Sequence, residues 1–90
     1  MTVFELKEIL RADYEPNGRL QDIIDRGISK IDTLTGVTHN YDSDREAESL
    51  LIAYCRYEYN NALEDFEQNF AMQINALSFR AAIQEMKDET

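Results

Sequence analysis

The stretch SDREAESLLIAYCRYEYNNALEDFEQNF, residues 43–70, decides the fold of this 90-residue chain. It opens with Ser43 and Glu46 at capping-box spacing, in which each side chain bonds the free backbone N–H of the other residue. No Gly or Pro, the residues that most disfavour a helix interior, follows before Phe66. The stretch therefore predicts one long helix from this cap to about Phe66.

The side chains of this long helix fall into two apolar stripes when each residue is rotated by about 100°. A surface helix ordinarily has one apolar stripe. The second stripe belongs either to the core of the chain's own bundle or to a contact with another chain, and tyrosines are enriched at protein–protein contacts. The broad stripe consists of Leu51, Ile52, Cys55, Tyr59, Ala62, Leu63 and Phe66. The narrower stripe, the candidate interface stripe, consists of Leu50, Tyr54, Tyr57 and Asn61.

Two helices are predicted before this stretch. Thr2 and Glu5 form another capping box, which starts a helix over residues 3 to about 11. Residues 12–18 contain the only proline, Pro16, and are predicted to be a loop because a proline disfavours helix at the preceding residue. The second helix follows from apolar residues at intervals of 3, 1, 3, 1, 3 and 3. These residues are Leu20, Ile23, Ile24, Gly27, Ile28, Ile31 and Leu34.

Two glycines have defined roles in this second helix. Gly27 lies on the apolar stripe, where the missing side chain lets another helix approach closely, at a cost of about 1 kcal/mol in helix propensity. Gly36 stands where a left-handed C-terminal cap belongs. Residues 37–42 are then predicted to link this helix to the long one.

A fourth helix is predicted from Asn69, as N-cap or hinge, to about Met86. Its apolar residues Phe70, Ile74, Leu77 and Ala81 stand at spacings of 4, 3 and 4. No alternating strand pattern occurs in the sequence. We therefore predict an all-α fold, a small bundle of about four helices around a long central helix, forming one domain over residues 1–90. The predicted core consists of Leu6, Ile9, Leu10, Ile24, Ile28, Ile31, Leu51, Cys55, Leu63 and Phe66.

The composition excludes two classes of partner. The chain has 18 acidic and 9 basic residues, a net charge of −9, which repels nucleic-acid phosphates. Residues 37–69 are the most acidic part, with 8 acids and 2 bases. No run approaches the roughly 20 apolar residues of a membrane span, and the N-terminus is too short and too acidic for a signal peptide. We expect a protein made in a cytoplasm, with no sequence-specific nucleic-acid binding and no membrane partner.

No residue cluster predicts a metal site. The alternating acids from Asp42 to Glu48 resemble the start of a calcium-binding loop. The positions that need Gly and Glu in such a loop hold Ala47 and Ala53 instead. Acids that favour a helix N-terminus explain the cluster better. His39 is the only histidine and is interpreted as a solvated loop residue.

Catalysis and cofactors are not expected either. Cys55 is the only cysteine and lies among apolar neighbours of the long helix, so it is interpreted as a small buried hydrophobe. The three glycines stand far apart, and no glycine-rich loop is present to cradle a phosphate. We predict no catalytic, cofactor-binding or metal-binding residue, and a protein that is not an enzyme.

Residues 50–70 resemble the head–tail connector (adaptor) proteins of long-tailed bacteriophages, often labelled DNA-packaging proteins. A long helix in that family carries a motif like L-L-x-x-Y-x-R-Y-x-Y-N-N-A-L-x-x-F-x-x-N-F. The motif covers about a quarter of the chain, and the looser arrangement of helices covers nearly all of it. The matching residues here are Leu50, Leu51, Tyr54, Arg56, Tyr57, Tyr59, Asn60, Asn61, Ala62, Leu63, Phe66, Asn69 and Phe70.

The resemblance implies a structural role in virion assembly. Such proteins form a ring of about a dozen subunits beneath the portal. The ring joins the portal to head-closure (stopper) or tail proteins, and DNA passes through its channel. The implied location is the head–tail junction of the virion, after assembly in the bacterial cytoplasm. The alternative is a small cytoplasmic helical regulator that binds one partner through the Tyr54 and Tyr57 face.

Overall fold

The first helix of the computed structural model, α1 (Val3–Leu10), begins at the predicted cap. The Thr2 hydroxyl accepts a hydrogen bond from the Glu5 N–H at 3.2 Å, and the Glu5 carboxylate accepts one from the Thr2 N–H at 3.3 Å. The helix ends at Arg11, whose φ of 54° is left-handed. The structure describes residues 1–88, and no strand occurs among them, so the all-α prediction is confirmed.

The second helix, α2 (Asn17–Thr35), begins earlier than predicted. Asn17 and Gly18, which were expected in the loop, form its first turn directly after Pro16. Proline has its φ fixed and lacks an N–H, so the chain can enter a helix right after it without losing a backbone hydrogen bond. The helix ends as predicted at Gly36, which has a φ of 79° and donates its N–H to the Asp32 carbonyl.

The third helix, α3 (Arg45–Tyr59), begins one residue later than the predicted capping box. The cap is Asp44, whose carboxylate accepts hydrogen bonds from the N–H groups of Glu46 at 3.2 Å and Ala47 at 3.3 Å. Ser43 instead lies in a turn, where its N–H donates to the Asn40 carbonyl. An aspartate caps a helix as well as a serine does, so the capping assignment to Ser43 and Glu46 was wrong.

The predicted extension of this helix to Phe66 is also wrong, because the chain reverses direction after Tyr59. Asn61 has a left-handed φ of 57°, a conformation that Asn adopts more readily than most residues. The Ala62 N–H donates to the Tyr57 carbonyl at 2.8 Å and the Asn61 N–H to the Glu58 carbonyl at 3.1 Å. This pair of bonds is the Schellman motif that ends many helices.

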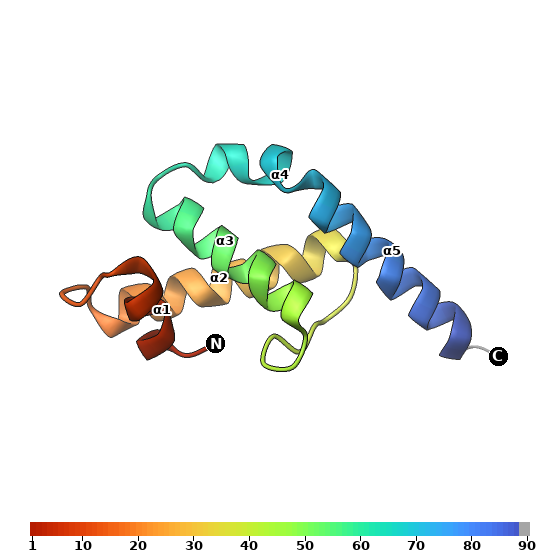
Figure 1. The fold of residues 1–90 in the computed structure, drawn as a ribbon, viewed down its shortest axis with the longest axis horizontal. Helices are drawn as coiled ribbons and strands as arrows, with labels where there is room; N and C mark the ends of the chain where they lie inside the picture. Colours follow the sequence, from red (N-terminus) through yellow and green to blue (C-terminus); the bar gives the residue numbers. More distant parts are fainter. Residues whose placement is uncertain (89–90) are drawn as a thin grey trace.

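Three helical segments follow the reversal. They are a 3-10 helix, η1 (Leu63–Asp65), the short α4 (Phe66–Asn69) and α5 (Ala71–Asp88). The predicted fourth helix is therefore present as α5. α3 packs across α2, α1 packs against both, and α5 packs against α2, α3 and α4 (Figure 1). The C-terminal half of α5 projects from the other helices, and the molecule measures 50 × 25 × 16 Å (Figure 1).

α2 and α3 approach each other closely at Gly27, as predicted. A Cβ atom placed on Gly27 would lie 2.7 Å from Leu51 Cδ1 and 2.7 Å from Tyr54 Cδ1. Real Cβ contacts are not this short, so a larger residue here would force the Leu51 and Tyr54 side chains, or the helices that carry them, to shift. The glycine therefore sets the distance at which the two central helices pack.

Most of the predicted core is buried. Leu6, Ile24, Ile31, Leu51, Cys55 and Phe66 are buried, and Leu10 and Ile28 pack against them while partly exposed. Ile9 on α1 is half-buried. Leu63 is 37% exposed, because it lies on η1 after the chain reversal and not on a continuing α3, so its assignment to the core was wrong. The core also contains buried apolar residues that the predicted core omitted: Ala12, Leu20, Ile23, Tyr41, Ala47, Leu50, Tyr54, Ile74 and Leu77.

Candidate assembly interface

Half of the candidate interface stripe lies inside the chain's own core. Leu50 is 3% exposed and Tyr54 is 4% exposed. The Tyr54 hydroxyl donates to the Glu58 carboxylate at 2.9 Å, and Arg26 of α2 donates to the same carboxylate at 2.8 and 2.7 Å. The prediction of a partner surface is therefore corrected for Leu50 and Tyr54, which hold α3 against α2 and the segments after α3.

Tyr57 is half-buried and also packs within the chain. Its ring lies edge-on to Phe66 at 6.0 Å and to Phe70 at 5.4 Å. Its hydroxyl accepts a hydrogen bond from Asn69 Nδ2 at 3.0 Å. Asn61 alone of the four is exposed, at the reversal itself. The second apolar face of α3 is thus covered by α4 and Phe70, which the reversal brings back across it.

The exposed apolar surface lies instead on α5. Met72 is 83% exposed, Phe79 is 69% exposed and Met86 is 69% exposed, while Ile83 is 38% exposed. Ala76 is exposed between them. These five residues, the α5 stripe, follow one another at spacings of 4, 3, 4 and 3 and so lie on one side of the helix.

The opposite side of α5 packs on the bundle. Ile74 and Leu77 are 8% and 1% exposed, and both belong to the core. The Ser78 hydroxyl donates to the Thr35 carbonyl of α2 at 3.4 Å. The prediction that Phe70, Ile74, Leu77 and Ala81 form the apolar face of the last helix agrees with this packing. The α5 stripe is a second apolar face, and the other described residues do not cover it.

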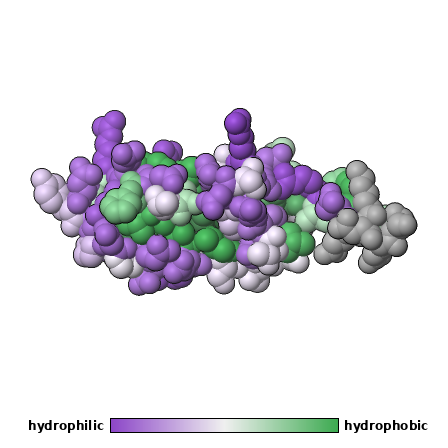
Figure 2. All heavy atoms as spheres, turned by 90° about the horizontal axis from the view of Figure 1, so that it is seen from below, coloured by the Kyte–Doolittle hydropathy of each residue, from purple (hydrophilic) through white to green (hydrophobic). Residues whose placement is uncertain are grey.

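Figure 2 shows the wider distribution of apolar surface from below. Hydrophobic residues gather among hydrophilic ones on the left half of this view, and smaller separate hydrophobic areas lie toward the right (Figure 2). Among large exposed apolar side chains outside α5, Phe4 on α1 is 71% exposed and Tyr14 in the following loop is 102% exposed. Apolar exposure thus occurs at several separate places.

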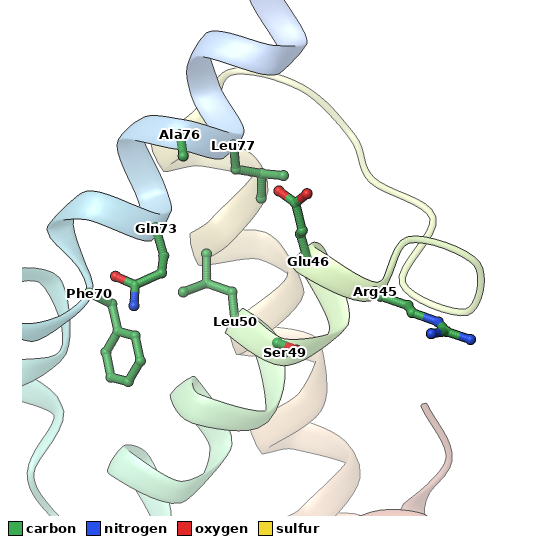
Figure 3. A pocket seen from close by; sticks show the side chains of 8 residues that line it. All are labelled: Arg45, Glu46, Ser49, Leu50, Phe70, Gln73, Ala76 and Leu77. Carbon is green, nitrogen blue, oxygen red and sulfur yellow. The ribbon is translucent and has the colours of Figure 1, made fainter.

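A groove of about 370 Å³ runs between the N-terminal half of α3 and α5 (Figure 3). Leu50, Phe70 and Leu77 supply apolar walls, and Ala76 belongs both to the groove and to the α5 stripe. The remaining lining residues are Arg45, Glu46, Ser49 and Gln73. The stripe and the groove are therefore neighbouring parts of one mostly apolar surface.

Arg80 holds α5 against the start of α3. Its guanidinium bonds the Asp44 carboxylate and lies 3.4 Å from the Glu46 carboxylate. Burial by itself raises the pKa of Asp44, but the hydrogen bonds from Arg80 and from backbone N–H groups outweigh it and lower that pKa. Asp44 is therefore ionised at neutral pH, which favours both its cap on α3 and its contact with α5.

The residues with reactive side chains are held in structural roles. Cys55 is fully buried, and burial raises its pKa to about 12, so the thiol stays protonated at neutral pH and is a poor nucleophile. His39 is half-buried and does not lie free in the linker, because its Nε2 is 2.7 Å from the Thr35 hydroxyl. The same hydroxyl lies 2.8 Å from the Ile31 carbonyl oxygen, so Thr35 links His39 to α2.

Within residues 1–88, no three or more His, Cys, Asp or Glu side chains are grouped so that they could hold a metal ion. None of the described helices combines the length and the apolar character needed to cross a membrane. Comparisons of the chain with models of protein families, with curated proteins and with solved structures found no match.

Proposed function

We propose that this protein is a structural subunit of a bacteriophage head–tail connector. In this role it forms a ring beneath the portal, joins the portal to head-closure or tail proteins, and leaves a channel for DNA. The observation that carries the proposal is the connector-like motif of residues 50–70. The role is non-catalytic and needs no cofactor, which accords with the buried, protonated thiol of Cys55.

The way the motif residues pack supports reading the motif as one structural unit. Its aromatic residues lie against one another across the chain reversal, with Tyr54 edge-on to Phe66 at 5.4 Å and Phe66 stacked on Phe70 at 5.4 Å. Its paired asparagines make the reversal, since Asn61 adopts the left-handed conformation. The spacing of the motif is therefore what a helix, a tight reversal and a returning short helix require.

The charge of the chain also suits a channel. A net charge of −9 per subunit gives a surface that repels phosphates, so DNA can pass without being held. The most acidic part, residues 37–69, includes α3 and the reversal. A protein that grips DNA would need the opposite charge.

A ring needs two different patches on each subunit that meet head to tail. The exposed apolar residues Phe4, Tyr14 and Leu63 lie on α1, in the following loop and on η1, so they offer separate patches of this kind. Leu63 and the exposed Asn61 belong to the connector-like motif, and Asn61 keeps the outer end of the candidate interface stripe available to a neighbour.

Mixing the protein with purified portal and imaging the product by electron microscopy tests the proposal. We expect ring-shaped density added to the portal with the wild-type chain. Leu63→Asp is expected to prevent this addition, while Ser29→Asp, at an exposed position of α2 outside the motif, is expected to leave it intact. A portal that gains no density from the wild-type chain contradicts the connector role. If the Leu63→Asp variant assembles as well as the wild type, only the contribution of Leu63 to the ring contact is contradicted.

A further inference from the structure

The α5 stripe has the periodicity of a helix that packs lengthwise on another helix. Its spacings of 4, 3, 4 and 3 repeat every 3.5 residues on average, the repeat of coiled-coil seams. The other side of α5 is already occupied by the bundle, where Ile74 and Leu77 are buried. The stripe therefore faces outward and has the spacing that a second, lengthwise helix would pack on. None of the described elements packs there.

The end of α5 lacks the packing that usually stabilises a helix. Ala82, Ile83, Gln84 and Met86 are all exposed, although α5 continues to Asp88. Short helices without tertiary packing are marginal in water. A helix laid along the stripe would bury Ile83 and supply contacts that this half of α5 lacks.

We propose that the α5 stripe binds the α5 stripe of a second copy of this chain, with the two helices antiparallel. In this arrangement Phe79 of one copy packs on Ala76 of the other, and Met72 packs on Ile83. The seam has four such layers, and the two central ones each pair the largest side chain of the stripe with the smallest. Such pairing of large and small residues fills a helix–helix seam without voids.

The residues beside the stripe do not oppose this pairing. The antiparallel register places Arg80 of one copy opposite Gln73 of the other, and Asn75 opposite Ala82, so no two like charges face each other. Antiparallel helices also align their dipoles favourably. The overall charge of −9 on each copy still opposes association, and salt screens that repulsion.

The exposed area agrees with a weak dimer. At their exposed fractions, the large stripe residues within the four layers, Met72, Phe79 and Ile83, present on the order of 400 Å² of surface, so two copies bury roughly 800 Å². This is below the roughly 1,000 Å² of a stable specific interface and in the range of weak, transient contacts. The pairing is two-fold and closes on itself. It therefore goes beyond the ring of the proposed function, which needs head-to-tail contacts, and either can be true without the other.

Sedimentation equilibrium of the purified protein tests the pairing without the portal. The mass is expected to rise from 10.5 kDa toward twice that value as the concentration increases, and to rise further with added salt. Phe79→Glu is expected to keep the protein monomeric at every concentration. Ser29→Glu is the control, because Ser29 is exposed on α2 and lies outside both proposed contacts while the variant adds the same charge; it is expected to dimerise as the wild type does.

A cross-linking experiment tests the orientation. An Asn75→Cys variant mixed with an Ala82→Cys variant is expected to form a disulfide-linked pair on mild oxidation, while each variant alone gives at least several-fold less. Both positions are exposed, and the native Cys55 is buried. A wild-type protein that stays monomeric at millimolar concentration in high salt overturns the proposal. So does a Phe79→Glu variant that dimerises normally, or a mixture that cross-links no better than its separate components.

Discussion

Two helices of this protein, α3 and α5, each have two apolar faces, but they differ in how many of those faces are buried. α3 buries both, with Leu51 and Cys55 at 0% exposure and Leu50 and Tyr54 at 3% and 4%. α5 buries one and leaves Phe79 on the other 69% exposed. The difference arises from what surrounds each helix. α3 has α2 on one side and, after the reversal, α4 and Phe70 on the other, whereas α5 has the bundle on one side only.

The comparison shows that two apolar stripes do not by themselves identify a partner surface. A stripe is free only if the chain does not return to cover it. On α3 the return is made by the reversal at Asn61, which places Phe66 and Phe70 against Tyr57. On α5 no described segment covers the face that carries Phe79. That face therefore stays open to a partner.

The largest effect is expected from truncating an α3 core residue. Leu51→Ala should lower the free energy of unfolding by about 2–5 kcal/mol, because it removes buried methyl groups and leaves a cavity. Chemical denaturation followed by circular dichroism measures this. An unchanged midpoint would mean that α3 does not form the centre of the bundle.

Gly27→Ala should have the next largest effect. The new Cβ would lie 2.7 Å from both Leu51 Cδ1 and Tyr54 Cδ1. We expect a cost of about 1–3 kcal/mol from overpacking, reduced by about 1 kcal/mol because Ala favours helix more than Gly does. Gly18→Ala is the control, since a Cβ there meets nothing within 4 Å. A Gly27→Ala variant as stable as this control would contradict the close crossing of α2 and α3.

Glu58 links α3 to α2 and makes this contact sensitive to pH. The hydrogen bond from Arg26 lowers the pKa of Glu58 below its ordinary value of 4.5, despite partial burial. Because the pKa is lower in the folded state, ionised Glu58 stabilises the fold above pH 4.5 and this contribution is lost as the pH falls below that value. Glu58→Gln should cost about 1 kcal/mol at pH 7.

The same variant should be less sensitive to acid. Thermal melts of the wild type and of Glu58→Gln between pH 7 and pH 3 are expected to converge at low pH, where Glu58 of the wild type becomes protonated. Parallel curves with a constant difference would show that the charge of Glu58 does not contribute.

The smallest effect is expected on the free face of α5. Phe79→Ser should change the stability of the dilute monomer by no more than about 0.5 kcal/mol, because surface positions contribute little. The measurement is the same denaturation experiment, made at low micromolar concentration. A loss of 2 kcal/mol or more would mean that Phe79 packs within the chain, and the contrast between the two helices would fail.

Part of the candidate interface was visible in the sequence and part was not. The spacing of Phe70, Ile74 and Leu77 correctly identified the inward face of α5, and the same 4-and-3 spacing at Met72, Phe79 and Ile83 was equally present. Apolar spacing alone does not tell which of two apolar faces of a helix the rest of the chain covers and which stays exposed. The Asn60–Asn61 pair was the available signal for the reversal, since Asn is second only to Gly at a left-handed helix end.

The sequence by itself determined the features that depend on neighbouring residues. Thr2 and Glu5 cap α1, Gly36 ends α2, and Gly27 makes room for α3 because these effects arise within one or two helical turns or from a missing side chain. The tertiary structure alone decided which apolar faces are covered. Burial of Tyr54 and exposure of Phe79 depend on segments distant along the chain, and the hydrophobic effect that drives burial has no preferred direction along the sequence.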